Sequence, residues 1–198
     1  MTQSLGAELR LLPVDEPLDD PGLLRELTQR YFVFDAFVAG ERRVDLHPLV
    51  LSAAAHRHAV DVAERVTRGI DDVASRAFAD DAEAHRYGFA DDVLTLARTS
   101  QAAGDRSALV RVDLLLGEDG RFQACEVNAD CPGGHNESVG LPALARRAGF
   151  RGGLAAGDVL EALVERLEAL ARREDGPGCV ALLHATAYAE DLQVCAFI

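Results

Sequence analysis

Residues 111–138 read RVDLLLGEDGRFQACEVNADCPGGHNES, and this stretch decides the fold prediction. On both sides of the GEDG tetrapeptide, apolar residues alternate with other residues, which is the period of a β-strand. Asp119-Gly120, inside the tetrapeptide, is the strongest short-range signal for a hairpin turn. The sequence therefore predicts an antiparallel hairpin with strands over about 109–116 and 121–127.

The two faces of this hairpin differ in character. On the first strand Arg111 and Asp113 point away from the apolar residues, and on the second strand Glu126 and Asn128 do so, while Cys125 shares the apolar face. A turn of two or four residues would place odd positions of the first strand opposite even positions of the second. We therefore expect Arg111, Asp113, Glu126 and Asn128 to cluster on one surface.

This polar cluster is chemically suited to a metal ion and a phosphate. Two carboxylates and an amide oxygen are hard ligands of the kind that Mg²⁺ prefers. An arginine beside them can stabilise the charge of a transferring phosphoryl group. The alternative is a hairpin with a merely polar outer face, because Arg opposite Glu is a common cross-strand pair. The Gly133-Gly134 loop after Asn128 favours the site, since glycines allow a ligand to approach the backbone closely.

The pattern R-x-D, a short hairpin, E-x-N-A-D-x-P and a following glutamate resembles the glutathionylspermidine synthase family of ATP-grasp ligases, which carry a circularly permuted ATP-grasp domain. The matching residues are Arg111, Asp113, Glu126, Asn128, Ala129, Asp130, Pro132 and Glu137. Weaker similarity extends over most of the chain. The segment HATAYAEDLQV, residues 184–194, resembles the first strand and helix of the family's substrate-side domain.

The resemblance implies a role for each matching residue. Asp113, Glu126 and Asn128 would be Mg²⁺ ligands, with Glu126 bridging two ions, and Arg111 would contact the transferred phosphoryl group. Arg111 and Asp113 would thus also form part of the ATP site. The residues implied to bind the substrate carboxylate are Cys131, Gly133, Gly134 and Glu137.

The resemblance also implies an activity, which is ATP- and Mg²⁺-dependent joining of a small carboxylate or peptide to an amine. The chain departs from the family at Cys131, where a hydroxyl residue is usual, and in the Gly133–His135 run. Both departures argue against glutathione as the acid. The chain also has no lysine, whereas the second half of an ATP-grasp site reaches the nucleotide phosphates with lysines. We therefore expect the chain alone to bind ATP hardly at all.

Outside the hairpin the sequence predicts an α/β (α+β) protein. Helical periodicity begins at Leu23, and a strand-like run follows at 32–34. Ser52 is a predicted N-cap for a long helix through Ala74, in which His56 and His58 are expected at the surface. Further helices are expected over about 91–97, 141–148, 156–173 and 189–198. Loops are expected at 100–107 and through the glycine-rich segment 131–140, and a buried strand over 179–184.

The domain prediction has two parts. Residues 1–175 would form the Mg²⁺- and phosphate-handling half of a circularly permuted ATP-grasp domain, and residues 176–198 would begin a truncated, Rossmann-like substrate-side domain. The apolar end VCAFI suggests a chain that stops inside an element. A C-terminal helix docked on the core is the alternative. The first interpretation implies a truncated ligase, inactive by itself.

Composition excludes some functions. The net charge of −13 argues against binding a nucleic-acid backbone, which needs clustered cations. No apolar run is long enough to span a bilayer and no signal peptide is visible, so a cytoplasmic protein without a membrane partner is expected. The four cysteines form no C-x-x-C pair. We expect mostly buried free thiols at three of them, with the role of Cys131 left open. A non-catalytic metal- or polyamine-binding protein derived from a ligase is the second functional hypothesis.

Overall fold

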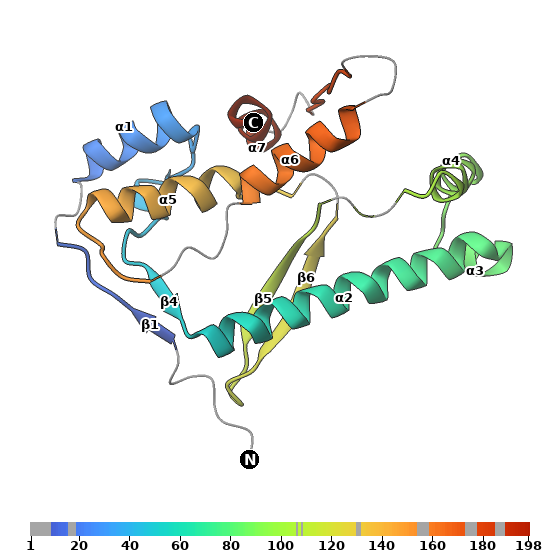
Figure 1. Cartoon of the computed structure of the whole chain (residues 1–198), viewed down its shortest axis with the longest axis horizontal. Coiled ribbons are helices and arrows are strands. Elements are labelled where there is room, and N and C mark those ends of the chain that lie inside the picture. The colour runs from blue at the N-terminus through green and yellow to red at the C-terminus, as the bar shows by residue number, and fades with distance from the viewer. Residues whose placement is uncertain are drawn as a thin grey trace. The chain divides into compact units, whose positions relative to one another are not determined.

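The structure is a computed structural model that describes residues 9–15, 19–105, 107, 109–129, 132–153, 159–172, 178–184 and 189–198. Within these residues it is a mixed α+β protein with seven helices and three two-stranded sheets (Figure 1). The chain divides into two compact units. Among the described residues, 51–132 form the first, here called the hairpin unit. Residues 9–50 and 133–198 together form the second, here called the α1–α5 unit.

The hairpin unit is built on a long helix. Ser52 caps this helix, α2, because its Oγ accepts a hydrogen bond from the backbone N–H of Ala55 at 3.1 Å. The other elements of the unit follow α2 along the chain, and α2 contacts each of them. The elements of the unit are α2 (Ala53–Ala79), α3 (Asp81–Arg86), α4 (Asp91–Ala102), β5 (Arg111–Leu116) and β6 (Phe122–Asn128).

The α1–α5 unit joins residues from both ends of the chain. Its core is made by α1 and α5, in which Leu23, Leu27 and Leu144 are fully buried. The elements are β1 (Leu9–Leu11), α1 (Asp20–Tyr31), β2 (Phe37–Val38), β3 (Glu41–Arg42), β4 (Leu49–Leu51), α5 (His135–Arg147), α6 (Val159–Ala171) and α7 (Ala189–Phe197). The strands pair β1 with β4 and β2 with β3.

Polar side chains connect three helices of this unit, α1, α5 and α7. The Nδ2 group of Asn136 on α5 donates to the carbonyl of Tyr31 at 2.9 Å and to that of Gln193 on α7 at 3.2 Å. Arg147 on α5 pairs with Glu26 on α1 at 2.6 Å, and this hydrogen bond lowers the pKa of Glu26. Helix α7 therefore lies against α1 and α5, where the Phe197 ring is 6.3 Å from that of Tyr31.

Three local sequence predictions are wrong, and the backbone conformation explains two of them. Residues 32–34 form no strand, because Phe32 adopts a left-handed conformation (φ 55°) that ends α1 and turns Val33 into the core. Residues 179–184 form no strand and are exposed, with Leu183 at 86%. The segment 135–140 is the start of α5 instead of loop, since Gly134 (φ 96°) serves as its N-cap.

The long helices extend beyond their predicted ends. Helix α2 continues to Ala79, and α4 includes residues 100–102, which were expected in a loop. His58 is half-buried on α2, with its ring 6.2 Å from that of Phe122 on β6, so it is not a surface residue. The predictions of α1, α6 and α7 as helices are confirmed. Among the described helices none is long and apolar enough to cross a membrane.

Helices α1 and α5 are in close contact at Gly140. A Cβ atom added there would lie 2.7 Å from Cγ and 3.1 Å from Cβ of Tyr31, which is itself buried. These atoms belong to the fixed base of the ring, so they cannot move aside as the end of a flexible side chain can. The absence of a side chain at position 140 thus sets the spacing of the two helices.

We predict that Gly140→Ala lowers the free energy of unfolding by about 1–3 kcal/mol through overpacking. Gly69→Ala is the matched control, since Gly69 lies inside α2 with nothing within 4 Å of an added Cβ. Helix propensity alone should make that variant more stable by up to about 1 kcal/mol. Urea unfolding followed by circular dichroism compares them. Equal stabilisation by both substitutions would show that Tyr31 does not constrain position 140.

Candidate functional site

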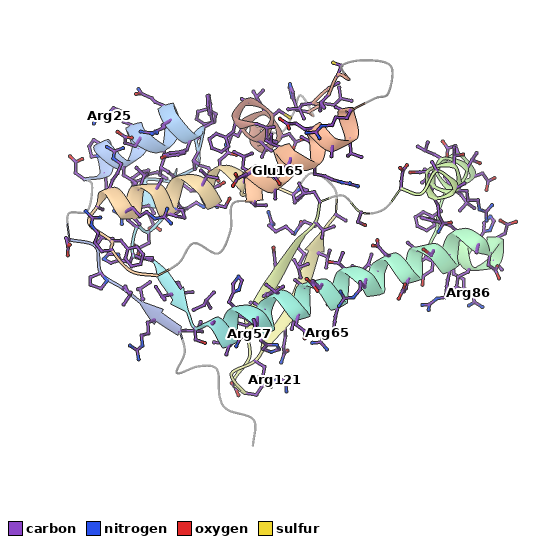
Figure 2. All side chains as sticks on the ribbon, viewed as in Figure 1. Arg25, Arg57, Arg65, Arg86, Arg121 and Glu165 are labelled. Carbon is purple, nitrogen blue, oxygen red and sulfur yellow. The ribbon has the colours of Figure 1, made fainter. Side chains whose placement is uncertain are left out.

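The β5–β6 hairpin carries the residues that the sequence singles out. Its register pairs Arg111 with Asn128 and Asp113 with Glu126, so the four side chains lie together on one face, as predicted. They occupy the open end of the hairpin, away from the turn from which Arg121 projects (Figure 2). The other face is apolar and lies against α2, where Val112 lines a cavity shared with that helix.

The turn differs from the one expected. The backbone N–H of Gly117 donates to the carbonyl of Arg121 at 2.8 Å, so residues 118–120 form a three-residue loop. Gly120 donates to Gly117 at 2.9 Å and has φ 73°, a conformation that glycine adopts without strain. With a loop of this length Leu116 faces Phe122, which means that even positions oppose even positions near the turn.

A β-bulge at Cys125 restores the predicted pairing at the site. Leu114 pairs with Ala124, but the next residue, Asp113, pairs with Glu126, which leaves Cys125 as the extra residue. The bulge also breaks the alternation on β6, so that Cys125 and Glu126 are both exposed. The prediction that Cys125 lies on the apolar face is therefore wrong. Its thiol donates to the carbonyl of Asp113 at 3.2 Å.

Arg111 and Asp113 form a bidentate ion pair. Nε of Arg111 donates to one carboxylate oxygen of Asp113 at 2.8 Å, and Nη2 donates to the other at 3.2 Å. With its amide oxygen turned toward Arg111, Asn128 accepts from Nη2 at 3.1 Å and donates to Glu126 at 3.1 Å. The four polar side chains thus form one connected hydrogen-bond network.

The electrostatics of the network follow from this pairing. The hydrogen bonds from Arg111 hold the pKa of Asp113 below its ordinary range. One arginine and two carboxylates leave the cluster with one net negative charge when all three are ionised. The side chains of Arg111 and Asp113 are 46% and 34% exposed, so solvent screens their attraction.

The donor set suits a hard divalent cation. Asp113, Glu126 and Asn128 offer carboxylate and amide oxygens on one face of the hairpin, which is the chemistry that Mg²⁺ prefers. Within the part of the chain that the structure describes, no group of three or more His, Cys, Asp or Glu residues could hold a metal. The hairpin cluster contains two residues of these types, Asp113 and Glu126, and its third candidate ligand is the amide oxygen of Asn128.

The predicted substrate-binding residues belong to the other compact unit, with one exception. Gly133 and Gly134 lead into α5, and Glu137 lies in the first turn of that helix. Cys131 lies outside the described residues, as does Asp130 of the E-x-N-A-D motif. Of the other cysteines, Cys125 and Cys179 are exposed and Cys195 is half-buried. The expectation of mostly buried thiols is wrong for these three.

Two contributions to the site escaped sequence reasoning. The bulge at Cys125 cannot be predicted from the period-2 pattern, because the sequence of a strand alternates in the same way whether or not one of its residues is unpaired. The support from α2 was also missed. Helix α2 contacts both strands and buries Val62. No family model, curated protein or solved structure matches the chain.

The ion pair makes the acidity of Asp113 depend on Arg111, and we predict that Arg111→Gln returns its pKa to the ordinary range. A carboxyl whose pKa falls on folding stabilises the fold above its unfolded-state pKa. That contribution is lost as the pH falls through the folded-state pKa. Carboxyl ¹³C NMR titration measures the change directly. Asp81 is the internal control, because Arg98 lowers its pKa and the substitution should leave it unchanged. An unaltered Asp113 titration in the variant would contradict the pairing.

Proposed function

We propose that this chain supplies the Mg²⁺- and phosphoryl-handling part of an ATP-dependent carboxylate–amine ligase, similar to glutathionylspermidine synthase. The observation that carries the proposal is the meeting of the R-x-D and E-x-N motifs on one face of a hairpin. Pairing of Arg111 with Asn128 and of Asp113 with Glu126 brings together an arginine, two carboxylates and an amide. A hairpin in the other register would have split this set between two faces.

Each residue has a role in this proposal. Asp113, Glu126 and Asn128 would hold Mg²⁺, with Glu126 between two ions, and the metal would neutralise phosphate oxygens. Arg111 would leave Asp113 when nucleotide and metal arrive and would bind the transferred phosphoryl group, which a guanidinium can contact with two hydrogen bonds. The resting ion pair thus keeps both side chains in place until they are needed.

The proposed reaction has two steps. A carboxylate oxygen of the acid attacks the γ-phosphorus of ATP, the bond to the bridging oxygen breaks, and ADP leaves. The amine nitrogen then attacks the carbonyl carbon of the acyl phosphate, phosphate departs with the electrons of the C–O bond, and the nitrogen loses a proton. Arg111 stabilises the phosphoryl oxygens during the first step and the departing phosphate during the second.

The finer parts of the proposal concern the rest of the protein. The fold would be half of a circularly permuted ATP-grasp domain over 1–175, followed by the start of a Rossmann-like substrate-side domain at 176–198. Gly133, Gly134, Glu137 and Cys131 would contact the acid. Tight ATP binding would require a further region bearing lysines, because this sequence has none.

A second candidate function follows from the self-contained network. Arg111 already satisfies both carboxylate oxygens of Asp113, and Asn128 links Arg111 to Glu126. Such a cluster is stable without a ligand, which suits a binding protein that holds a metal or polyamine without turnover. Release of ADP separates the ligase from the binder.

We predict weak Mg²⁺ binding by the 198-residue chain, centred on the hairpin face. Glu126→Gln should weaken it by roughly the 10- to 100-fold that loss of a supporting ligand causes, or more. The matched control is Glu118→Gln, which removes the same charge from the exposed turn of the same hairpin. Mn²⁺ relaxation enhancement, with Mg²⁺ as competitor, gives the affinities. Equal weakening by both substitutions would show that Mg²⁺ is attracted by the overall negative charge and is not bound at a specific site.

In a protein that contains this hairpin together with a lysine-bearing nucleotide site, Glu126→Gln should lower turnover by roughly two to four orders of magnitude. As a metal ligand, the Glu126 carboxylate would act mainly in the transition state, where charge accumulates on the phosphoryl oxygens. Folding should be little affected, because the neutral amide relieves repulsion from Asp113. ADP release and the melting midpoint are measured together. A fully active variant, or one inactive only because it unfolds, would remove Glu126 from catalysis.

A further inference from the structure

The α1–α5 unit contains a cavity of about 270 Å³ beside the second half of α5. One wall is the segment that leads into β4, and the other is formed by α5 and Phe150. Seven of the ten residues around the cavity are apolar. Two of its lining residues, Leu46 and Ala145, are buried members of the core. At its rim Leu49 is 61% exposed, so apolar surface remains in contact with water there.

The three polar residues around the cavity are Asp45, His47 and Arg146. Asp45 is a carboxylate with partners of its own, because its Oδ1 accepts from the backbone N–H of His47 at 2.9 Å and faces the ring Nδ1 of His47 at 2.5 Å. A nitrogen of Arg42 lies 3.8 Å away on the same carboxylate oxygen. These hydrogen bonds from His47 also hold the pKa of Asp45 below its ordinary range.

Arg146 differs from three nearby arginines in its ion pairing. Arg147, the next residue on α5, pairs with Glu26, and Arg42 and Arg43 pair with aspartates. Among the ion pairs of the described residues, none includes Arg146. Among the described residues, the lining therefore combines seven apolar residues with one guanidinium that is in no ion pair, and its one carboxylate, Asp45, is hydrogen-bonded to His47.

We propose that this cavity binds a small organic carboxylate with an apolar, preferably aromatic, body. Arg146 would take the carboxylate, since the guanidinium fork matches its two oxygens. The apolar wall around Leu49, Leu141 and Phe150 would cover the body and remove both surfaces from water. The volume lies just below the roughly 300–1,000 Å³ of drug-sized ligand sites, which limits the ligand to about the size of one ring with a short acid arm.

This proposal is independent of the ligase assignment. None of the hairpin residues Arg111, Asp113, Glu126 or Asn128 lines the cavity, and the cavity belongs entirely to the other compact unit. Loss of Mg²⁺ binding at the hairpin would leave the carboxylate site intact, and the reverse also holds.

Phenylacetate tests the proposal. Added to the full chain, it should bind with a Kd on the order of a millimolar, which is typical of a ligand of this size. Amide ¹⁵N shifts should concentrate at residues 45–49 and 141–150. Phenylacetamide, which keeps the shape but has no charge, should bind at least about tenfold more weakly, the cost of one charged hydrogen-bonded pair.

Matched variants separate the guanidinium from general charge. Arg146→Gln should weaken phenylacetate binding at least about tenfold. Arg25→Gln removes the same charge from the exposed face of α1 in the same unit (Figure 2) and should leave the Kd unchanged. Leu49→Trp should weaken binding by filling the rim, at an exposed strand position that tolerates tryptophan. Circular dichroism confirms that each variant folds.

Equal affinity of the wild type and Arg146→Gln for phenylacetate would overturn the proposal, as would shifts confined to the hairpin unit. An absence of binding at about ten times the expected Kd would also overturn it. Unchanged affinity in Leu49→Trp would place the ligand outside this cavity.

Discussion

With its three-residue loop, this hairpin can present Asp113 and Glu126 side by side only because the strand pairing shifts by one residue between the turn and the site. The three-residue loop at 118–120 fixes one register, and that register alone would set Asp113 against Cys125. The extra residue at Cys125 shifts the pairing by one, and every polar side chain beyond it moves to a common face. The Arg111–Asp113 ion pair, the bridging amide of Asn128 and the donor set for a metal all depend on this one unpaired residue.

The same network shows how a cluster of charges can remain stable while it waits for a ligand. Two exposed carboxylates on one face would repel each other, but Arg111 lies on Asp113 and Asn128 links Arg111 to Glu126. Because the pair is partly exposed, the free energy needed to separate it is small. In the proposed ligase, a metal and a phosphate would replace this internal contact with stronger external ones, and the hairpin backbone would not need to move.

Local periodicity predicted the hairpin, the Ser52 cap and most helices, because these features depend on residues close in the chain. It failed where the backbone leaves the regular regions. Aromatic residues at 32–34 favour a strand, but the left-handed Phe32 turns the chain instead. The glycines at 133–134 indicate a loop, yet Gly134 begins a helix. The bulge at Cys125 has no sequence signature. The cluster was nevertheless predicted correctly, because a turn of two or four residues without a bulge gives the same pairing at the site as the three-residue loop with one. The cavity at Arg146 joins segments about a hundred residues apart, which no local pattern reports.

The joining of residues 9–50 with 133–198 has a consequence for synthesis on the ribosome. The carbonyl of Tyr31 meets the amide of Asn136 across 105 residues, and Glu26 meets Arg147 across 121. At translation rates of roughly 5–20 residues per second, α1 emerges about 5–25 seconds before its partner helix exists. During that interval Leu23 and Leu27 have no α5 to cover them, while the whole of the hairpin unit can form. Nascent chains should thus expose an apolar α1 stripe, a surface that chaperones recognise, until residue 147 has left the exit tunnel.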